Sequence, residues 1–239
     1  MSNVVRVNII VEGQTEETFV RDLLQGHLAN VGVYAVARCV VTGRKHGKIY
    51  RGGMTTYTRA RRDIRRWLSE DPSAYLTTMF DLYKLPPDFP NSNQTKTFYA
   101  PHERVRRIEA AIATDIQSQR FIPYVQLYEF EGLLFSNVQV IDRILNIHSS
   151  SQLAALKEIR TQFRTPEEIN DGETTAPSKR LKSLYPGYDK VTYGPRIAQR
   201  IGLDTLRQEC PHFDDWVSKL ETLAGRASSR RTTPNRGAA

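Results

Sequence analysis

The chain has 239 residues, 25% of them charged and 39% hydrophobic, a balance that excludes wholesale disorder and fits a globular protein able to bury a core without staples. Its formal charge is +8, which favours an acidic partner such as nucleic acid. Cys39 and Cys210 lie far apart with no zinc-like spacing, so we expect neither a disulfide framework nor a zinc site. No apolar run suits a membrane span or a signal segment, and we expect a soluble, cytoplasmic protein.

The first half of the sequence alternates between strand and helix patterns. Val4 to Val11 predicts a buried strand, and a helix follows from Thr15 with apolar residues at helical spacing. A second strand is expected over Val33 to Val41, then a loop from Thr42 to Gly53 and a helix from Tyr57 to Leu68.

Two further strands continue the pattern. Tyr75 to Phe80 predicts a third strand that stops at Asp81, and a Pro- and Asn-rich loop leads from it to a helix. Ile122 to Tyr128 predicts a fourth strand that stops at Glu129. Near the C-terminus we expect two helices split at Pro211, packed on the sheet or against a partner, and then a disordered tail from Arg226 to Ala239.

This alternation predicts an α/β fold with a mostly parallel sheet and helices on both faces. In such sheets ligands bind beyond the carboxyl ends of the strands. Three of the four predicted strands end there in an acid: Glu12, Asp81 and Glu129, with Glu16 and Glu131 close by in sequence. Clustered carboxylates repel each other unless a cation neutralises them, and oxygen-only ligands suit Mg²⁺ or Mn²⁺. The alternative is that these acids cap helices and form turns.

The positive charge gathers in one segment. Between Arg38 and Arg66 ten basic residues stand against the single acid Asp63, which is the footprint of a surface facing phosphates. The alternative is a solvated helix face with a basic loop. The candidate nucleic-acid-binding residues are Arg44, Lys45, Lys48, Arg59, Arg62, Arg66 and, further along the chain, Arg180.

Lys179, beside Arg180, is a candidate for offsetting charge on a phosphate. The alternative there is a solvated helix start with Ser178 as its N-cap. His46 in the basic loop is expected to make a contact rather than to act as a base.

Several motifs resemble those of a known family. Val11 to Glu16, with Phe19, looks like the first motif of Toprim domains, and Asp81 stands where that superfamily carries an Asp-x-Asp pair. The stretch from Tyr128 to Ser136 and several short C-terminal motifs resemble an uncharacterised bacterial Toprim-like family related to the OLD nucleases; those C-terminal motifs are Ile169 to Gly172, Ala176 to Leu181, Ile197 to Leu203 and Cys210 to Phe213.

The resemblance implies a Toprim-like (Rossmannoid) domain over residues 1–148, a helical extension over 149–225 and a basic tail over 226–239. It also implies a catalytic set of Glu12, Glu16, Asp81, Glu129 and Lys179, with metal held by Glu12, Asp81, Glu129 and Glu131. Members of this family resemble proteins encoded beside an AAA-type ATPase, with a role in defence against foreign DNA.

One position departs from the motif. Tyr83 replaces the second Asp, and Asp88 lies too far along a proline-containing loop to substitute for it. Three interpretations stay open: Glu129 or Glu131 holds a second metal, the site carries one ion, or activity has been lost.

Two hypotheses of different classes follow. The first is a metal-dependent nuclease or related phosphoryl-transfer subunit acting on nucleic acid. The second is a non-catalytic binding or sensor subunit of an ATPase-containing complex. A nucleotide-binding switch is weaker, because no Walker-type glycine-rich loop occurs. The substrate, DNA or RNA, and the oligomeric state stay open.

Overall fold

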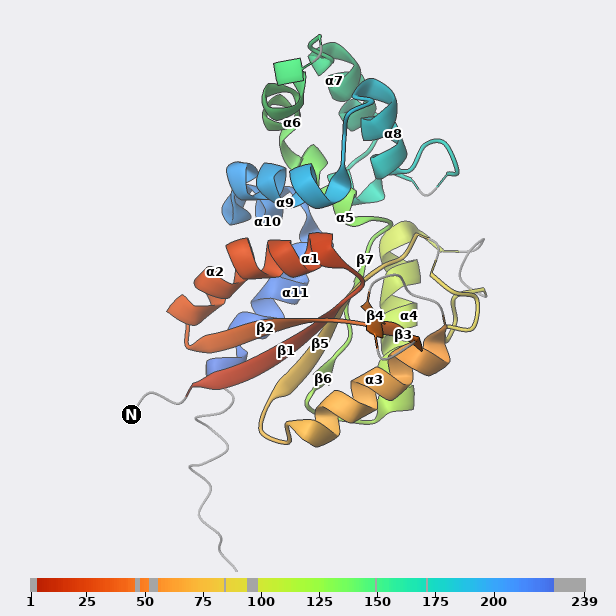
Figure 1. Ribbon diagram of the computed structural model, residues 1–239, viewed down its shortest axis with the longest axis vertical. Helices are drawn as coiled ribbons and strands as arrows, with labels where there is room; N and C mark the ends of the chain where they lie inside the picture. The colour runs from red at the N-terminus through yellow and green to blue at the C-terminus, as the bar shows by residue number, and fades with distance from the viewer. Residues whose placement is uncertain are drawn as a thin grey trace, which may run out of the picture.

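The computed structural model describes residues 4–45, 48–51, 56–83, 85–93, 99–148, 150–170 and 172–225. A five-stranded sheet has the order β2-β1-β5-β6, with β7 pairing the end of β5, and every pair in it is parallel (Figure 1). Its strands are β1 (Val5–Val11), β2 (Val33–Cys39), β5 (Tyr75–Asp81), β6 (Phe121–Ile122) and β7 (Val125–Gln126).

Helices cover both faces of this sheet. The first crossover is one helical run with a π-helical middle: α1 (Gln14–Phe19), η1 (Val20–Leu24) and α2 (Gln25–Asn30). The other helices are α3 (Tyr57–Glu70), α4 (Pro101–Ile116), α5 (Phe130–Leu134), α6 (Val138–Leu145), α7 (Leu153–Thr161), α8 (Pro177–Leu184), α9 (Lys190–Ile201), α10 (Leu203–Glu209) and α11 (Pro211–Glu221). Short 3₁₀ turns are η2 (Phe135–Asn137), η3 (Asn146–His148) and η4 (Pro166–Glu168).

Alternate residues of the central strand β1 feed two separate cores. Val7 and Ile9 belong to the larger core, together with apolar residues of α1, α2, α9 and α11. Ile10 points the other way, into a core formed with α3 and α4. A strand buried on both faces accounts for the nearly unbroken apolar run in the sequence. The expected α/β class, with a mostly parallel sheet and a helical C-terminal part, is confirmed.

The C-terminal helix α11 is fixed to the sheet by polar as well as apolar contacts. The indole N–H of Trp216 donates to the Thr77 hydroxyl at 2.9 Å, and its ring stacks on Tyr124 with 4.3 Å between centroids. Both aromatic side chains are buried. The helix α11 therefore packs on the sheet through Trp216.

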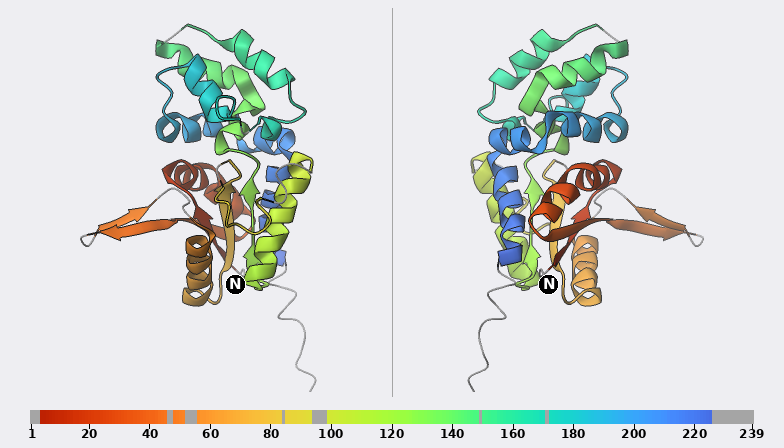
Figure 2. Two further views of the ribbon diagram at one scale, coloured as in Figure 1. Left: turned by 90° about the vertical axis from the view of Figure 1, so that its right-hand side faces the viewer. Right: turned by 90° about the vertical axis from the view of Figure 1, so that its left-hand side faces the viewer.

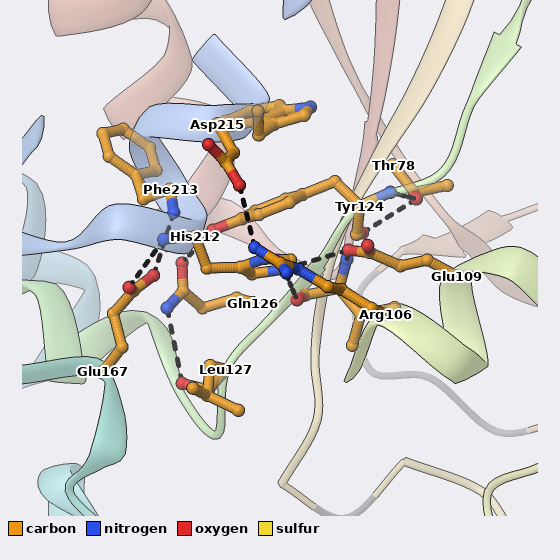
Figure 3. A network of polar contacts seen from close by, with 12 residues as sticks. Thr78, Arg106, Glu109, Tyr124, Gln126, Leu127, Glu167, His212, Phe213 and Asp215 are labelled. Carbon is orange, nitrogen blue, oxygen red and sulfur yellow. Dashed lines mark hydrogen bonds and ion pairs between the residues drawn. The ribbon is translucent and has the colours of Figure 1, made fainter. Parts of the chain in front are cut away.

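The start of α11 is held by a buried polar network, shown in Figure 3. Glu167 accepts the backbone N–H groups of His212 and Phe213, which lie in the first turn of α11, at 2.9 and 3.0 Å. The His212 ring contacts Glu109 of α4 at 3.0 Å, and Glu109 also accepts the backbone N–H of Val125. The elements η4, α11 and α4 are thus linked to one another and to β7.

Three expectations about the elements are wrong in detail. Part of the expected loop from Thr42 to Gly53 forms an antiparallel hairpin, β3 (Val41–Lys45) with β4 (Lys48–Arg51), which projects from the body in Figure 2. The fourth strand is split into β6 and β7 at Pro123, which has no N–H for a ladder; the Thr78 hydroxyl bonds both backbone groups of Tyr124 instead. The C-terminal helices break at Gly202, with φ of 86°, as well as before Pro211.

The boundary at 148 and 149 stays a prediction, and the tail from 226 lies outside the described residues. Figures 1 and 2 place α6, α7 and α8 beyond α9, at the end of the sheet where its strands finish. None of the helices within the described part of the chain has the length and apolarity that a membrane span needs.

We expect Trp216→Ala to lower the free energy of unfolding by about 3–5 kcal/mol, because it removes a buried ring and leaves Thr77 without this donor. Trp216→Phe should cost less, since it keeps an aromatic ring against Tyr124. Trp67→Ala, on the partly exposed side of α3, is the control and should cost less than Trp216→Ala. Urea unfolding measures all three, and equal losses for both alanine variants would contradict the proposed anchor.

Candidate metal centre at the strand ends

The acids at the ends of neighbouring strands are linked through backbone hydrogen bonds. A Glu12 oxygen accepts the backbone N–H of Asp81 at 2.9 Å, which joins the end of β1 to the end of β5. An Asp81 oxygen accepts the backbone N–H of Phe130 at 3.0 Å, which joins β5 to the start of α5. The structure therefore brings Glu12 and Asp81 together at one edge of the sheet, with Glu129 next in the chain to Phe130.

Glu129 leaves the sheet through a strained turn. The preceding residue, Tyr128, has φ of 62°, a left-handed conformation that costs a residue with a side chain about 1–2 kcal/mol. The Tyr83 backbone N–H donates to the Tyr128 carbonyl at 2.7 Å and holds this turn. Both Glu129 oxygens then accept hydrogen bonds from Ser178, one from its N–H at 2.8 Å and one from its hydroxyl at 2.9 Å. Glu129 thus connects the sheet edge to α8.

Two more acids complete the cluster. Glu16 lies in the first turn of α1 and accepts the backbone N–H of Gly13 at 3.0 Å, while Glu131 lies in the first turn of α5. Both are buried, with 3% and 2% of their surface exposed. Glu12 and Asp81 are half-buried as whole residues.

Burial and mutual repulsion hold protons on this cluster. Burial, followed by the charge of Glu16, raises the pKa of Glu12 to about 8. Burial, followed by the charge of Glu129, raises the pKa of Glu131 to about 7. For Asp81 burial comes first and all four surrounding glutamates add to it, so its pKa lies well above the ordinary value. When these acids are ionised, their negative charge at the sheet edge exceeds the positive charge that the described residues place beside it.

Lys190 is the cation that interacts with these acids. Burial lowers the pKa of its amine, but the charges of Glu131, Glu16, Asp81 and Glu12 outweigh burial and raise it overall, so the amine keeps its proton. Lys190 begins α9, which lies close against α1 and α5: a Cβ added at Gly194 would come within 3.2 Å of both Thr15 and Phe130. The glycine permits the approach that brings Lys190 to the acids. The sequence analysis missed this residue.

Capping explains part of the arrangement. Glu16, Asp81 and Glu129 each accept a backbone N–H at a helix start, as the alternative interpretation of these acids expected. Capping does not require five acids in one place, however, and three capping carboxylates would not need buried companions such as Glu131.

The chemistry of these donors suits a divalent cation, although within the described residues no group of three or more His, Cys, Asp or Glu side chains is placed so that it could hold a metal ion. All the donors are carboxylate oxygens with excess negative charge in a largely buried place, which is what Mg²⁺ and Mn²⁺ select. Glu12, Glu16, Asp81 and Glu131 are the residues that would hold such an ion. Glu129, named with them from the sequence, already has both oxygens engaged by Ser178.

The other candidates near the site have separate positions. Lys179 is exposed on α8. The Arg180 guanidinium donates to the Thr175 carbonyl at 2.6 Å and lies 5.6 Å from the Phe163 ring centroid, so it fixes the loop before α8. That helix starts at Pro177 with Ala176 as N-cap, so the expectation that Ser178 is the N-cap is wrong. Ser178 instead donates hydrogen bonds to the Glu129 carboxylate, which approaches from outside the helix.

The basic candidates lie on α3 and the hairpin. Arg59 and Arg62 are exposed on α3, whereas Arg66 is half-buried and lies 5.2 Å from the Trp67 ring centroid. The side chains of Arg44, Lys45 and Lys48 on the hairpin, and His46 altogether, lie outside the described residues. Asp88 accepts the backbone N–H of Tyr57 at 2.8 Å and so caps α3, in agreement with its exclusion from the acidic set.

The sequence of the chain matches a known protein family. A model of a domain of unknown function, DUF4276, matches residues 11–221, and the chain belongs to this family. The expected membership of an uncharacterised family is thereby confirmed. No curated protein matches the chain.

Among solved structures the chain is similar to the C-terminal region of the Burkholderia pseudomallei OLD protein, at 15% identity and a TM-score of 0.40, covering 89% of this chain and 98% of that one. It is also similar to the C-terminal region of the Xanthomonas campestris pv. campestris OLD protein, at 15% identity and a TM-score of 0.35, covering 90% and 94%. At these scores the likeness carries no conclusion about function.

We expect the free energy of unfolding, measured in EDTA, to fall as pH rises from about 4.5 to about 8. Over this window the folded protein keeps protons that the unfolded chain has released, on Glu12 up to about pH 8 and on Glu131 up to about pH 7. Each retained proton contributes a slope of about 1.4 kcal/mol per pH unit. Urea unfolding at pH 5.5 and 8.5 measures the slope.

Mn²⁺ should stabilise the protein more at pH 8.5 than at pH 5.5, because the cation binds the ionised carboxylates. Glu12→Gln should reduce both the pH slope and the Mn²⁺ effect. A variant with the wild-type slope and the wild-type Mn²⁺ effect would show that Glu12 does not belong to a cation site.

Proposed function

We propose that this protein is a divalent-metal-dependent nuclease, or a related phosphoryl-transfer subunit, that acts on nucleic acid. The observation that carries the proposal is the convergence of four glutamates on Asp81 at the carboxyl ends of a parallel sheet. The basic residues between Arg38 and Arg66 would give the same protein a surface suited to phosphates.

The residues divide the work in this proposal. Glu12, Glu16, Asp81 and Glu131 would hold Mg²⁺ or Mn²⁺, which when bound supplies Lewis-acid stabilisation of phosphoryl oxygens and activates water. Lys190, protonated at neutral pH, faces the same acids and can donate a hydrogen bond to a phosphate oxygen. Ser178 holds the Glu129 carboxylate in place through two hydrogen bonds. Arg59, Arg62 and Arg66 would hold the strand by its backbone.

We also propose that the protein acts in the cytoplasm with an ATPase partner, in defence against foreign DNA. This part rests on the resemblance of the motifs around Glu12, Asp81 and Glu129 to the Toprim-like family related to the OLD nucleases.

A binding or sensor subunit without catalysis is the second candidate. Tyr83 occupies the position of the second Asp, and its backbone is used to hold the strained Tyr128 turn. Each Glu129 oxygen accepts one hydrogen bond from Ser178, and Glu12 and Asp81 each accept a backbone N–H. A scaffold that keeps the strand-end acids as caps fits these observations too.

Glu12→Gln should abolish Mg²⁺- or Mn²⁺-dependent cleavage of nucleic acid while the protein stays folded, since it removes one ligand charge with little change of shape. Glu17→Gln, at a half-buried position in the first turn of α1, is the matched control and should cleave like the wild type. Cleavage of single- and double-stranded DNA and RNA is followed on gels, with circular dichroism to check folding.

Cleavage by Glu12→Gln at the wild-type rate would count decisively against the nuclease. A wild type that cleaves none of these substrates, alone or with a co-encoded ATPase, would instead favour the binding subunit.

Replacing Arg59, Arg62 and Arg66 together by Ala should weaken binding to unrelated nucleic-acid sequences by similar factors and make its salt dependence shallower, because contacts to phosphates carry no sequence information. The control replaces the exposed Lys157, Lys182 and Lys219 by Ala, which removes the same charge elsewhere. Fluorescence anisotropy across a salt titration measures both variants. Equal affinity of the Arg variant and the wild type at every salt concentration would place the binding surface elsewhere.

A further inference from the structure

A second feature that the proposed function does not use is a pocket between α6 and α9. It has a volume of about 510 Å³ and is lined by Arg143, Ile144, Ile147, Arg196, Gln199 and Arg200. The size lies within the range of small-molecule sites.

The described residues of the lining include three arginines and no acid. Among the described residues, no ion pair or hydrogen bond joins the guanidinium groups of Arg143, Arg196 and Arg200 to another side chain. Arg143 and Arg200 lie in the last turns of α6 and α9, where the helix dipole favours a cation by about 0.3–1 kcal/mol. The dipole does not account for Arg196, which is four residues before Arg200 on the same helix, a spacing at which like charges repel. An anion in the pocket would relieve this repulsion.

The pocket also has an apolar wall. Ile144 and Ile147 line it from α6 and the turn after it, and Ile147 is 64% exposed. Neighbouring arginine and isoleucine side chains suit a ligand with an anionic group and a flat or apolar part. Guanidinium groups bind phosphate through paired hydrogen bonds and stack on aromatic planes.

We propose that this pocket binds a phosphate-bearing ligand of the mononucleotide type, with the phosphate on Arg143, Arg196 and Arg200 and the base against Ile144 and Ile147. Two sources share this chemistry: a free nucleotide and the terminal nucleotide of a strand. The strand is compatible with the position of Lys190, which starts the same helix about 15 Å along its axis from Arg200. The pocket itself does not require the metal centre.

The test is isothermal titration calorimetry of the full chain in EDTA with adenosine 5′-monophosphate, adenosine and inorganic phosphate. The monophosphate should bind at least about tenfold more tightly than either of the others, since each lacks one half of the interaction. Arg196→Ala with Arg200→Ala should weaken the monophosphate by about tenfold or more, and Arg200→Lys by less, because lysine keeps the charge but not the paired geometry. Lys157→Ala with Lys182→Ala removes the same charge outside the pocket and should bind like the wild type.

Equal binding of adenosine and its monophosphate, or an arginine double variant that binds like the wild type, would overturn the proposal. If inorganic phosphate binds as tightly as the monophosphate, the proposed contact of the base with Ile144 and Ile147 is wrong. A 5′-phosphorylated tetranucleotide that binds more tightly than the monophosphate, with the gain lost in the double variant, assigns the pocket to strand ends; equal affinities assign it to free nucleotide. Glu12→Gln should leave the affinity for the monophosphate unchanged, so failure of the metal centre and failure of this pocket give different results.

Discussion

The surplus of negative charge at the carboxyl ends of the parallel strands is the constraint on which the rest of this structure depends. Five acids interact there, and among the described residues Lys190 is the cation that acts on them. Without a metal ion, the repulsion within such a cluster is offset by Lys190, by the backbone N–H groups that its oxygens accept and by the protons that several of its members keep. The same features that make it costly for a folded chain make it suited to a divalent ion.

Several local devices keep the acids in place despite their repulsion. The strained Tyr128 backbone directs Glu129 away from the sheet towards Ser178, and Gly194 lets α9 approach closely enough for Lys190 to reach the cluster. Ser178 and Lys190 both come from the C-terminal helical part. The site therefore depends on the docking of that part onto the sheet, to which α11 contributes through Trp216 and the Glu167 cap. A protein truncated after the sheet would lack two of the groups that balance the acids.

Sequence reasoning was sufficient wherever a pattern follows from a short stretch of chain. The apolar run of β1, the abrupt stop at Asp81 and the rule for parallel sheets together place Glu12 and Asp81 at one edge. The same reasoning missed Lys190, because nothing near it in sequence points to an acid more than a hundred residues away. It also missed the hairpin of β3 and β4, since a highly charged segment with glycines resembles a loop. The break in the fourth strand at Pro123 was missed as well, because there the Thr78 hydroxyl replaces the backbone hydrogen bonds between strands.

Tyr83, at the position where the Toprim motif has its second aspartate, separates the nuclease proposal from the binding-subunit proposal most clearly. In this chain Tyr83 uses its backbone to hold the turn before Glu129, and no other described acid has moved into its place: Asp88 caps α3. A single ion held by Glu12, Asp81 and their buried neighbours is the arrangement that the nuclease proposal needs. The binding-subunit proposal needs the acids only as caps.

Anomalous diffraction from crystals soaked in Mn²⁺ tests the central claim most directly. The account predicts an anomalous peak in direct coordination with carboxylate oxygens of Glu12 and Asp81, with the Glu12 side chain released from the Asp81 backbone N–H. Crystals saturated with Mn²⁺ that show no peak at this edge, with Glu12 still bonded to the Asp81 N–H, would contradict it.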